Sequence, residues 1–432
     1  METHPVELVR ITTAHGVYEG TLLPSQGSTL ILKLKNGYNV GIKKGSIITE
    51  EKLGVREHVS TKPSVHLQDD KKPLVSILHL GGTIAAKVDY ATGATTPRFE
   101  PEELLTMFPE LRDEARIESR LLRNMLSENM QPGQYNVIAH AIEAEITKNP
   151  SIQGIIVSHG TDTMQYTAAA LSFILENCPI PVILVGSQRS SDRGSSDAAM
   201  NLLSAVHFIV NTEWTGVGVC MHKGTSDTEC WVLPGTNVVK LHTARRDAFH
   251  PVNALEIASI DVKSKTITYT PAKKVPVAGD GTFRVRTLDP ALKIGLLKSH
   301  PGIHAAEFSF YRNYDGLVIE GSGLGHLPIE VVDDETKENA ALWEVVKELA
   351  SIKPVVMTSQ CLYGRVSMQV YSPGRMLQDA GVLGHDCDMT STCAYMKLWW
   401  LLSQERDNVK ELYGKNLRGE ISESTSTETF LR

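Results

Sequence analysis

Residues 155–164 read Ile155-Ile156-Val157-Ser158-His159-Gly160-Thr161-Asp162-Thr163-Met164. Three β-branched apolar residues come first, and a helical pattern from Gln165 to Leu175 follows, so the stretch predicts a strand, a turn and a helix. A Thr-Asp pair therefore falls on a turn at the carboxyl end of a strand. Ligands in open α/β sheets bind at such strand ends, which makes this turn a candidate site.

A second threonine lies on a similar turn. The apolar run Leu74–Leu80 is closed by Gly81-Gly82-Thr83-Ile84-Ala85. A threonine hydroxyl is a poor nucleophile at neutral pH and needs a neighbouring base, while two glycines would let the backbone pass close to a ligand. On the residues alone, Thr83, Thr161 and Asp162 could equally serve as helix caps.

A candidate base is Lys240, within Asn237-Val238-Val239-Lys240-Leu241-His242-Thr243. Buried lysines lose their proton readily and can act as general bases. Such a lysine could activate Thr161 while Asp162 fixes its position. The alternative is that Lys240 is an ordinary surface charge.

Apolar runs alternate with helical patterns from residue 74 onward. The strands expected in the first block are Leu74–Leu80, Gly154–Val157, Val182–Val185 and Val217–Met221, with helices at Pro101–Met107, Tyr135–Thr147, Met164–Leu175 and Asp197–Ile209. The second block has strands at Ile294–Leu297, Gly316–Ile319 and Val355–Thr358, with helices at Lys337–Ala350 and Ala394–Gln404. This alternation predicts two doubly wound α/β domains, residues 74–289 and 290–432, each with a parallel sheet covered on both faces.

The chain before this region has a different pattern. Short strands are expected at Val17–Leu23, Leu30–Leu34 and Tyr38–Ile42, and Asn36-Gly37 is a strong hairpin signal. We therefore expect a small all-β barrel over residues 1–56, followed by a polar linker at 57–73. At the other end, the Ser-, Thr- and Glu-rich tail after Gly414 is expected to fray.

Composition excludes several classes of protein. The 432 residues carry a formal net charge of −7, which argues against nucleic-acid binding by bulk electrostatics. The longest apolar stretches are far shorter than the ~20 residues that a membrane span needs. Six scattered cysteines without a Cys-x-x-Cys pair, and an N-terminus unlike a signal peptide, predict a cytoplasmic protein with reduced thiols. No P-loop sequence is present, so no ATP site of that type is expected.

From Leu74 to Gln404 the chain resembles the bacterial-type L-asparaginase/glutaminase family, because residues 81–85 and 159–164 match its two active-site motifs in order and spacing. The resemblance implies two asparaginase-like domains, with Thr83 as the acyl-accepting nucleophile and Thr161, Lys240 and Asp162 as a triad. It also implies that Ser127 and Glu128 bind the substrate. Glu128 stands where free-standing asparaginases usually carry glutamine.

The N-terminal module adds a resemblance to a more specific family. A small barrel, a polar linker and an asparaginase-like body together resemble the D-subunit family of archaeal glutamyl-tRNA(Gln) amidotransferases. Matching stretches lie at residues 89–94, 243–249 and 360–366. The resemblance implies a glutaminase that releases ammonia from L-glutamine. A partner, the E subunit, phosphorylates the glutamate of Glu-tRNA(Gln) and receives that ammonia.

The same resemblance implies a homodimer core within a heterotetramer, no cofactor or metal in this chain, and ATP and Mg in the partner. Two other hypotheses stay open from the sequence. One is a free-standing L-asparaginase/glutaminase that has gained an N-terminal module. The other is an RNA-binding protein in which the asparaginase-like body is only a scaffold. Lys33, Lys35, Lys43 and Lys44 give the module a basic edge, for which we favour partner docking over direct tRNA reading.

Overall fold

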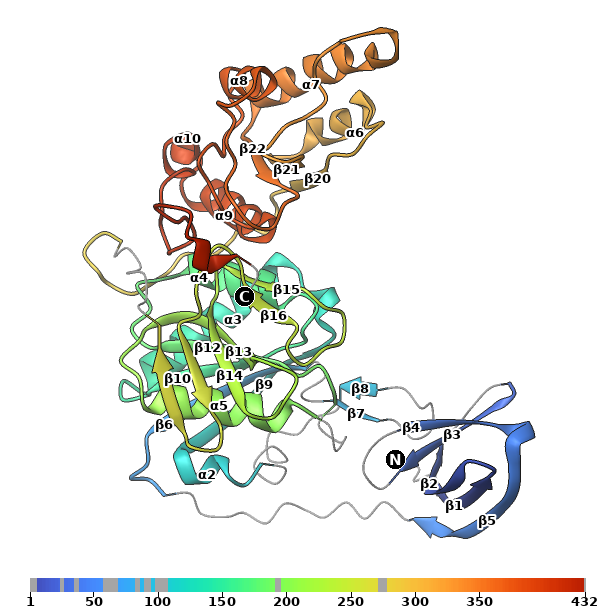
Figure 1. The fold of residues 1–432 in the computed structure, drawn as a ribbon. Coiled ribbons are helices and arrows are strands. Elements are labelled where there is room, and N and C mark those ends of the chain that lie inside the picture. Colours follow the sequence, from blue (N-terminus) through green and yellow to red (C-terminus); the bar gives the residue numbers. More distant parts are fainter. Residues whose placement is uncertain are drawn as a thin grey trace.

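An all-β module, an α/β body and a smaller α/β domain follow one another along the chain (Figure 1). Among the described residues no helix is both long enough and apolar enough to cross a membrane. The computed structural model describes residues 6–23, 27–34, 39–56, 69–81, 86–88, 95–97, 108–190, 196–270 and 278–430.

The N-terminal module is a five-stranded antiparallel sheet with strand order β4-β3-β2-β1-β5. Its strands are β1 (Val6–Thr13), β2 (Gly16–Leu23), β3 (Thr29–Leu34), β4 (Asn39–Lys43) and β5 (Ile47–Arg56). Alternate residues point inward and form a small core that includes Val9, Ile11 and Leu32. The sequence predicted β2, β3 and β4 but missed β1 and β5. Four consecutive polar residues, 49–52, interrupt the apolar residues of β5, so the sequence shows no strand alternation there.

The body is built on an eight-stranded sheet with strand order β18-β17-β14-β13-β12-β10-β6-β9. Strands β6, β10, β12 and β13 are parallel, as predicted; β9, which the sequence did not predict, extends the parallel part, and β14, β17 and β18 add antiparallel strands at the other edge. The connection between β13 and β14, residues 223–228, is too short for a helical crossover, so the second strand must return antiparallel. The eight strands are β6 (Leu74–Gly81), β9 (Arg116–Met125), β10 (Gly154–Ser158), β12 (Pro181–Val185), β13 (Gly216–His222), β14 (Glu229–Pro234), β17 (Ala258–Asp261) and β18 (Thr266–Tyr269).

Helices cover both faces of this sheet, as the sequence predicted. Ile155 and Val157 of β10 belong to one core cluster, and Ile156 between them belongs to another on the opposite face. The first cluster includes side chains from α3 and α4, and the second includes side chains from α2 and α5. These helices are α2 (Leu111–Glu114), α3 (Pro132–Lys148), α4 (Met164–Ile174) and α5 (Ala198–Val210). The helix predicted at Pro101–Met107 lies outside the described residues.

Three short antiparallel pairs complete the body. They are β7 (Ala86–Val88) with β8 (Thr95–Pro97), β11 (Leu175–Glu176) with β19 (Arg284–Val285), and β15 (Val238–Lys240) with β16 (Phe249–Pro251). The β15–β16 ribbon positions the candidate base, because Lys240 is the last residue of β15.

The C-terminal domain has a parallel sheet of β20 (Ile294–Lys298), β21 (Gly316–Gly321) and β22 (Val355–Ser359), all three predicted. Trp399 and Trp400 are buried. The ring of Trp400 packs 6.0 Å from that of Phe173 in α4, so α9 joins this domain to the body. The helices of the domain are α6 (Ala305–Ser309), α7 (Glu338–Ile352), α8 (Ser372–Asp379), α9 (Ser391–Gln404) and α10 (Val409–Leu412).

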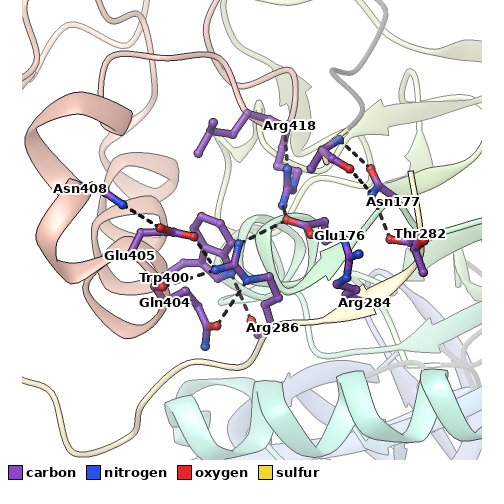
Figure 2. A network of polar contacts seen from close by, with 12 residues as sticks. Glu176, Asn177, Thr282, Arg284, Arg286, Trp400, Gln404, Glu405, Asn408 and Arg418 are labelled. Atoms are coloured by element: carbon purple, nitrogen blue, oxygen red, sulfur yellow. Dashed lines mark hydrogen bonds and ion pairs between the residues drawn. The ribbon is translucent and has the colours of Figure 1, made fainter. Parts of the chain in front are cut away.

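A network of arginines around Glu176 reinforces this joint (Figure 2). The buried carboxylate of Glu176 accepts a hydrogen bond from Arg418 at 2.8 Å and lies 3.5 Å from the guanidinium of Arg286. Arg286 also forms an ion pair with Glu405 at 2.6 Å, and both guanidinium groups lie against the ring of Trp400. The strand β11, which follows α4, the segment before β20 and the C-terminal tail are therefore tied together.

The chain after Gly414 is packed, and the prediction that it frays is wrong for residues 415–422. Lys397 of α9 and Glu420 are both fully buried, and the lysine Nζ lies 2.6 Å from a carboxylate oxygen of the glutamate. Glu420 also accepts the backbone N–H groups of Leu417 and Arg418. Composition predicted fraying because it cannot show that one acid of the tail has a buried cationic partner.

Candidate active site

Lys240 lies at the centre of the candidate site. Its Nζ donates to Thr161 Oγ1 at 2.9 Å and to Asp162 Oδ1 at 2.6 Å. Its backbone N–H donates to the side-chain oxygen of Gln165 in α4 at 2.7 Å, which holds the β15–β16 ribbon against the turn after β10. The lysine side chain is 9% exposed and that of Asp162 is 67% exposed, so the pair lies at the opening of the site. Three residues singled out from the sequence thus meet here.

The turn that carries Thr161 is held by the buried ring of His159. Its Nδ1 lies 2.6 Å from the carbonyl oxygen of Gly160, and its Nε2 lies 2.8 Å from the hydroxyl of Thr167. Because a carbonyl only accepts, Nδ1 carries the proton and Nε2 accepts from the threonine. Burial lowers the pKa of His159 to about 4, so the ring is neutral at pH 7. The histidine therefore fixes the turn without adding a charge.

Ser127 and Glu128 reach the same place from a 3-10 turn, Ser127–Asn129, that follows β9. The Thr163 hydroxyl donates to the carbonyl oxygen of Ser127 at 2.6 Å and joins this segment to the turn. A Cβ at Gly160 would lie 2.8 Å from the Ser127 side chain, so only glycine permits this approach. Ser127 is buried and Glu128 is exposed, which leaves the Glu128 carboxylate available to a ligand.

The other wall comes from the end of β12. A Cβ at Gly186 would lie 2.8 Å from Thr161 Cγ2, so this glycine allows the segment to pack against the turn. Between the walls is a cavity of about 170 Å³. Its lining includes Gln188 and Thr243, which the sequence reasoning did not single out as site residues. The full lining is Leu126, Ser127, Glu128, Gly160, Thr161, Asp162, Gln188, Lys240 and Thr243.

Thr83 lies outside the described residues, and its role stays a prediction. The strand before its turn, β6, pairs in parallel with β10, with His79 opposite Ser158. The carboxyl ends of β6 and β10 therefore meet at the same edge of the sheet, beside the cavity. Among the residues that the structure describes, no group of three or more His, Cys, Asp or Glu side chains could hold a metal ion.

This arrangement has the parts needed for acyl transfer. A hydroxyl within hydrogen-bonding distance of a lysine amine can exchange a proton with it, and a carboxylate beside the amine keeps it in place. Two further carboxyl or hydroxyl side chains, Glu128 and Ser127, line the same cavity. The roles of the individual residues stay predictions.

Three family models match successive parts of the chain. Residues 3–51 match the family model of the GatD N-terminal domain, residues 74–273 that of Asparaginase, N-terminal, and residues 293–412 that of the Glutaminase/Asparaginase C-terminal domain. The D subunit of glutamyl-tRNA(Gln) amidotransferase from Pyrococcus abyssi is 41% identical over 447 residues, covering 99% of this chain and 97% of the relative. The chain belongs to the D-subunit family of glutamyl-tRNA(Gln) amidotransferases.

Another member of the D-subunit family, from Methanococcus maripaludis strain C7, is 41% identical over 432 residues, with 98% of this chain and 99% of the relative covered. Solved asparaginases resemble the part of the chain beyond the N-terminal module. The thermostable L-asparaginase from Thermococcus kodakarensis is 32% identical with a TM-score of 0.70, covering 81% of this chain and 100% of that chain. L-asparaginase I from Vibrio cholerae is 29% identical with a TM-score of 0.69, covering 81% and 99%. This member of the D-subunit family therefore combines an asparaginase fold with an added N-terminal module.

Proposed function

We propose that this protein is the glutaminase subunit of a tRNA-dependent amidotransferase. It releases ammonia from L-glutamine, and the complex uses that ammonia to convert Glu-tRNA(Gln) to Gln-tRNA(Gln). The observation that carries the proposal is the contact of Lys240 with both Thr161 and Asp162 at a cavity lined by Ser127 and Glu128. The match of the first domain to the GatD N-terminal domain supports the amidotransferase role.

In the proposed reaction the Thr83 oxygen attacks the side-chain carbonyl of glutamine, and its proton passes to the Lys240 amine through Thr161. Backbone N–H groups at the two turns stabilise the oxyanion. The C–N bond breaks, ammonia leaves with a proton delivered through Thr161 and Lys240, and a γ-glutamyl ester remains on Thr83. Water then hydrolyses the ester to glutamate and restores the hydroxyl.

The charges of the cavity suit an amino-acid substrate. Asp162 and Glu128 offer carboxylates to the α-ammonium group, while Ser127 can donate to the α-carboxylate. Lys240 already lies 2.6 Å from Asp162, so Glu128 is the carboxylate without a lysine partner in the lining. This distribution favours a substrate with a free α-ammonium group.

The proposal extends to the assembly. This chain needs no cofactor, a partner known as the E subunit binds ATP and Mg, two copies of this chain form the core of a heterotetramer, and the complex acts in the cytoplasm. Lys43 and Lys44, both exposed at the end of β4, would dock the partner rather than read the tRNA.

The test is ammonia release by the full chain from L-glutamine and from L-asparagine, with and without the partner, ATP and Glu-tRNA(Gln). We expect glutamine hydrolysis that rises when partner and charged tRNA are added. The likeness to solved L-asparaginases makes a free-standing asparaginase the second candidate. Robust asparagine hydrolysis by the chain alone would favour that candidate, and tight tRNA binding without any hydrolysis would favour an RNA-binding scaffold.

A further inference from the structure

Two buried residues hold the wall of the cavity beside Thr161. They are Asp197, which directly precedes α5, and Asn201 within α5. The Asp197 carboxylate, which is 0% exposed, accepts the backbone N–H of Gln188 at 3.0 Å on both oxygens and that of Arg189 at 3.1 Å. The side-chain amide of Asn201 donates to the carbonyl of Gly186 at 3.0 Å and to Asp197 at 3.1 Å. The backbone over residues 186–189 is therefore fixed, while the side chain of Gln188 is left to face the cavity.

The amide nitrogen of Gln188 is an unusual group. Gln188 lines the cavity, yet its Nε2 is shielded from solvent and has no hydrogen-bond partner among the described residues. Nearly all buried polar groups in native proteins are hydrogen-bonded, because an unsatisfied donor destabilises the fold. If a bound ligand supplies an acceptor, the Gln188 Nε2–H gains the hydrogen-bond partner that it lacks among the described residues.

The geometry of the cavity walls indicates which part of the ligand supplies the acceptor for Gln188. The turn at Gly160 and Thr161 separates two sides of the cavity, since Gly160 packs against Ser127 and Thr161 packs against Gly186. The Glu128 carboxylate belongs to the first side and the neutral Gln188 amide to the second. An amino acid with its α-ammonium group near Glu128 and Asp162 would extend its side chain past Thr161 toward Gln188.

We propose that Gln188 is a substrate-binding residue that donates its Nε2–H to the carboxamide oxygen of bound L-glutamine. Asp197 is the positioning residue that holds Gln188 in place through its backbone. The inference rests on the proposed function, because it takes glutamine as the substrate.

The first test is Gln188→Met in the full complex, with ammonia release and thermal unfolding measured on the same preparation. Methionine has a similar length but no donor. Loss of the hydrogen bond to substrate lowers kcat/KM for glutamine by about tenfold. At the same time Tm stays equal to that of wild type or rises, because the unpartnered donor is gone. A purely structural role predicts instead that activity and Tm fall together, and that outcome, or a kcat/KM within about twofold of wild type, overturns the proposal.

The second test asks whether Asp197 acts through Gln188. Asp197→Asn replaces one of the two accepting carboxylate oxygens by an NH2 donor, which opposes the Gln188 N–H and the Asn201 amide, and it is expected to lower kcat/KM. If it acts through Gln188, the double variant with Gln188→Met loses no more kcat/KM than the more impaired single variant. Fully additive losses contradict the positioning role. Asp261→Asn is the matched control, because Asp261 also accepts a backbone N–H, that of Ser264 at 2.7 Å, but does not line the cavity.

The two proposals fail in different ways. A wild-type complex that hydrolyses glutamine while Gln188→Met keeps full activity overturns only the role of Gln188. A wild-type complex that releases no ammonia from glutamine, with partner, ATP and charged tRNA present, overturns the proposed function and with it this inference.

Discussion

The side chain of Asn253 in the body donates to the carbonyl oxygen of Asp388 in the C-terminal domain at 2.7 Å. The same amide nitrogen lies 3.3 Å from the carbonyl oxygens of Leu362 and Gly364, and its oxygen accepts the Gly364 N–H at 2.9 Å. Asn253 has φ 55°, a conformation that asparagine adopts more readily than most residues. One buried side chain thus fastens two loops of the second domain to the first.

Asn253→Ala should therefore destabilise the protein by about 3 kcal/mol, since it leaves several buried groups unpaired and adds backbone strain. Urea unfolding of the full chain checks this value. Asn339→Ala is the control, because within the described part of the chain the Asn339 side chain makes one hydrogen bond, to the carbonyl oxygen of Glu330. Equal losses for the two variants would argue against Asn253 as a fastening between domains.

Removing the proposed base or the proposed nucleophile should abolish ammonia release while the fold persists. For Lys240→Ala and for Thr83→Val we expect at least about a 100-fold loss of kcat, the usual contribution of a proton-transferring group or more. The measurement is glutaminase activity, with circular dichroism as the check on folding. Lys223→Ala serves as the control, because Lys223 pairs with Glu229 on the surface. A near-normal rate in either variant refutes the assignment of that residue.

Glu128→Gln tests the proposed role of the Glu128 carboxylate in binding the substrate. The amide keeps the size of the side chain but loses the charge that attracts an α-ammonium group. KM for glutamine should rise by about tenfold with little change in kcat, as expected when a charged hydrogen bond becomes a neutral one. Steady-state kinetics at neutral pH decide the point. An unchanged KM would mean that Glu128 does not bind the substrate.

His159 should make stability depend on pH. Its folded pKa of about 4 lies below the ordinary value of 6.5, so the unfolded chain takes up a proton first as pH falls. The stabilisation is fully present above about pH 6.5 and is lost as pH falls toward 4, by up to about 3 kcal/mol. Unfolding measured across this range should show a shallower dependence for His159→Gln. Parallel curves for the two proteins would contradict this account.

Substitution of Lys397 alone should destabilise the protein more than substitution of Lys397 and Glu420 together. Lys397→Met alone leaves an unpaired buried carboxylate and should destabilise the protein by about 3–5 kcal/mol. Adding Glu420→Gln removes the charge and keeps an acceptor for the N–H of Leu417, so most of that loss should be recovered. Thermal unfolding of both variants provides the comparison. A double variant that is less stable than Lys397→Met would show that the charge itself is not the cause.

Periodicity predicted the body well because its central strands are continuous apolar runs. The run before Thr161 became β10, and the helical pattern after it became α4, with bounds that differ little from those expected. The strand β9 was missed because it is rich in arginine and lies at the edge of the sheet, where side chains stay in solvent. Tertiary position, rather than local pattern, makes it a strand.

Part of the candidate site could also be predicted from the sequence, and part could not. The motif residues Thr161 and Asp162 stand out in the sequence, and the structure places Lys240 beside them. Nothing local distinguishes Lys240 from other lysines, so only the resemblance to a family singled it out. Gln188 and Asp197 carry no motif, since their relation depends on a loop that returns to the start of α5. Such contacts between distant segments are visible only in the folded chain.

The β15–β16 ribbon gives the proposed base an anchorage separate from that of its hydroxyl partner. Lys240 is the last residue of β15, whereas Thr161 is attached to the main sheet through β10. The five residues after the lysine, 241–245, are all exposed. Both segments are nevertheless packed into one core, because Val238 and Phe249 of the ribbon belong to the same buried cluster as Val157 of β10. The 2.9 Å contact between the lysine amine and the threonine hydroxyl therefore depends on the packing of the β15–β16 ribbon against that core.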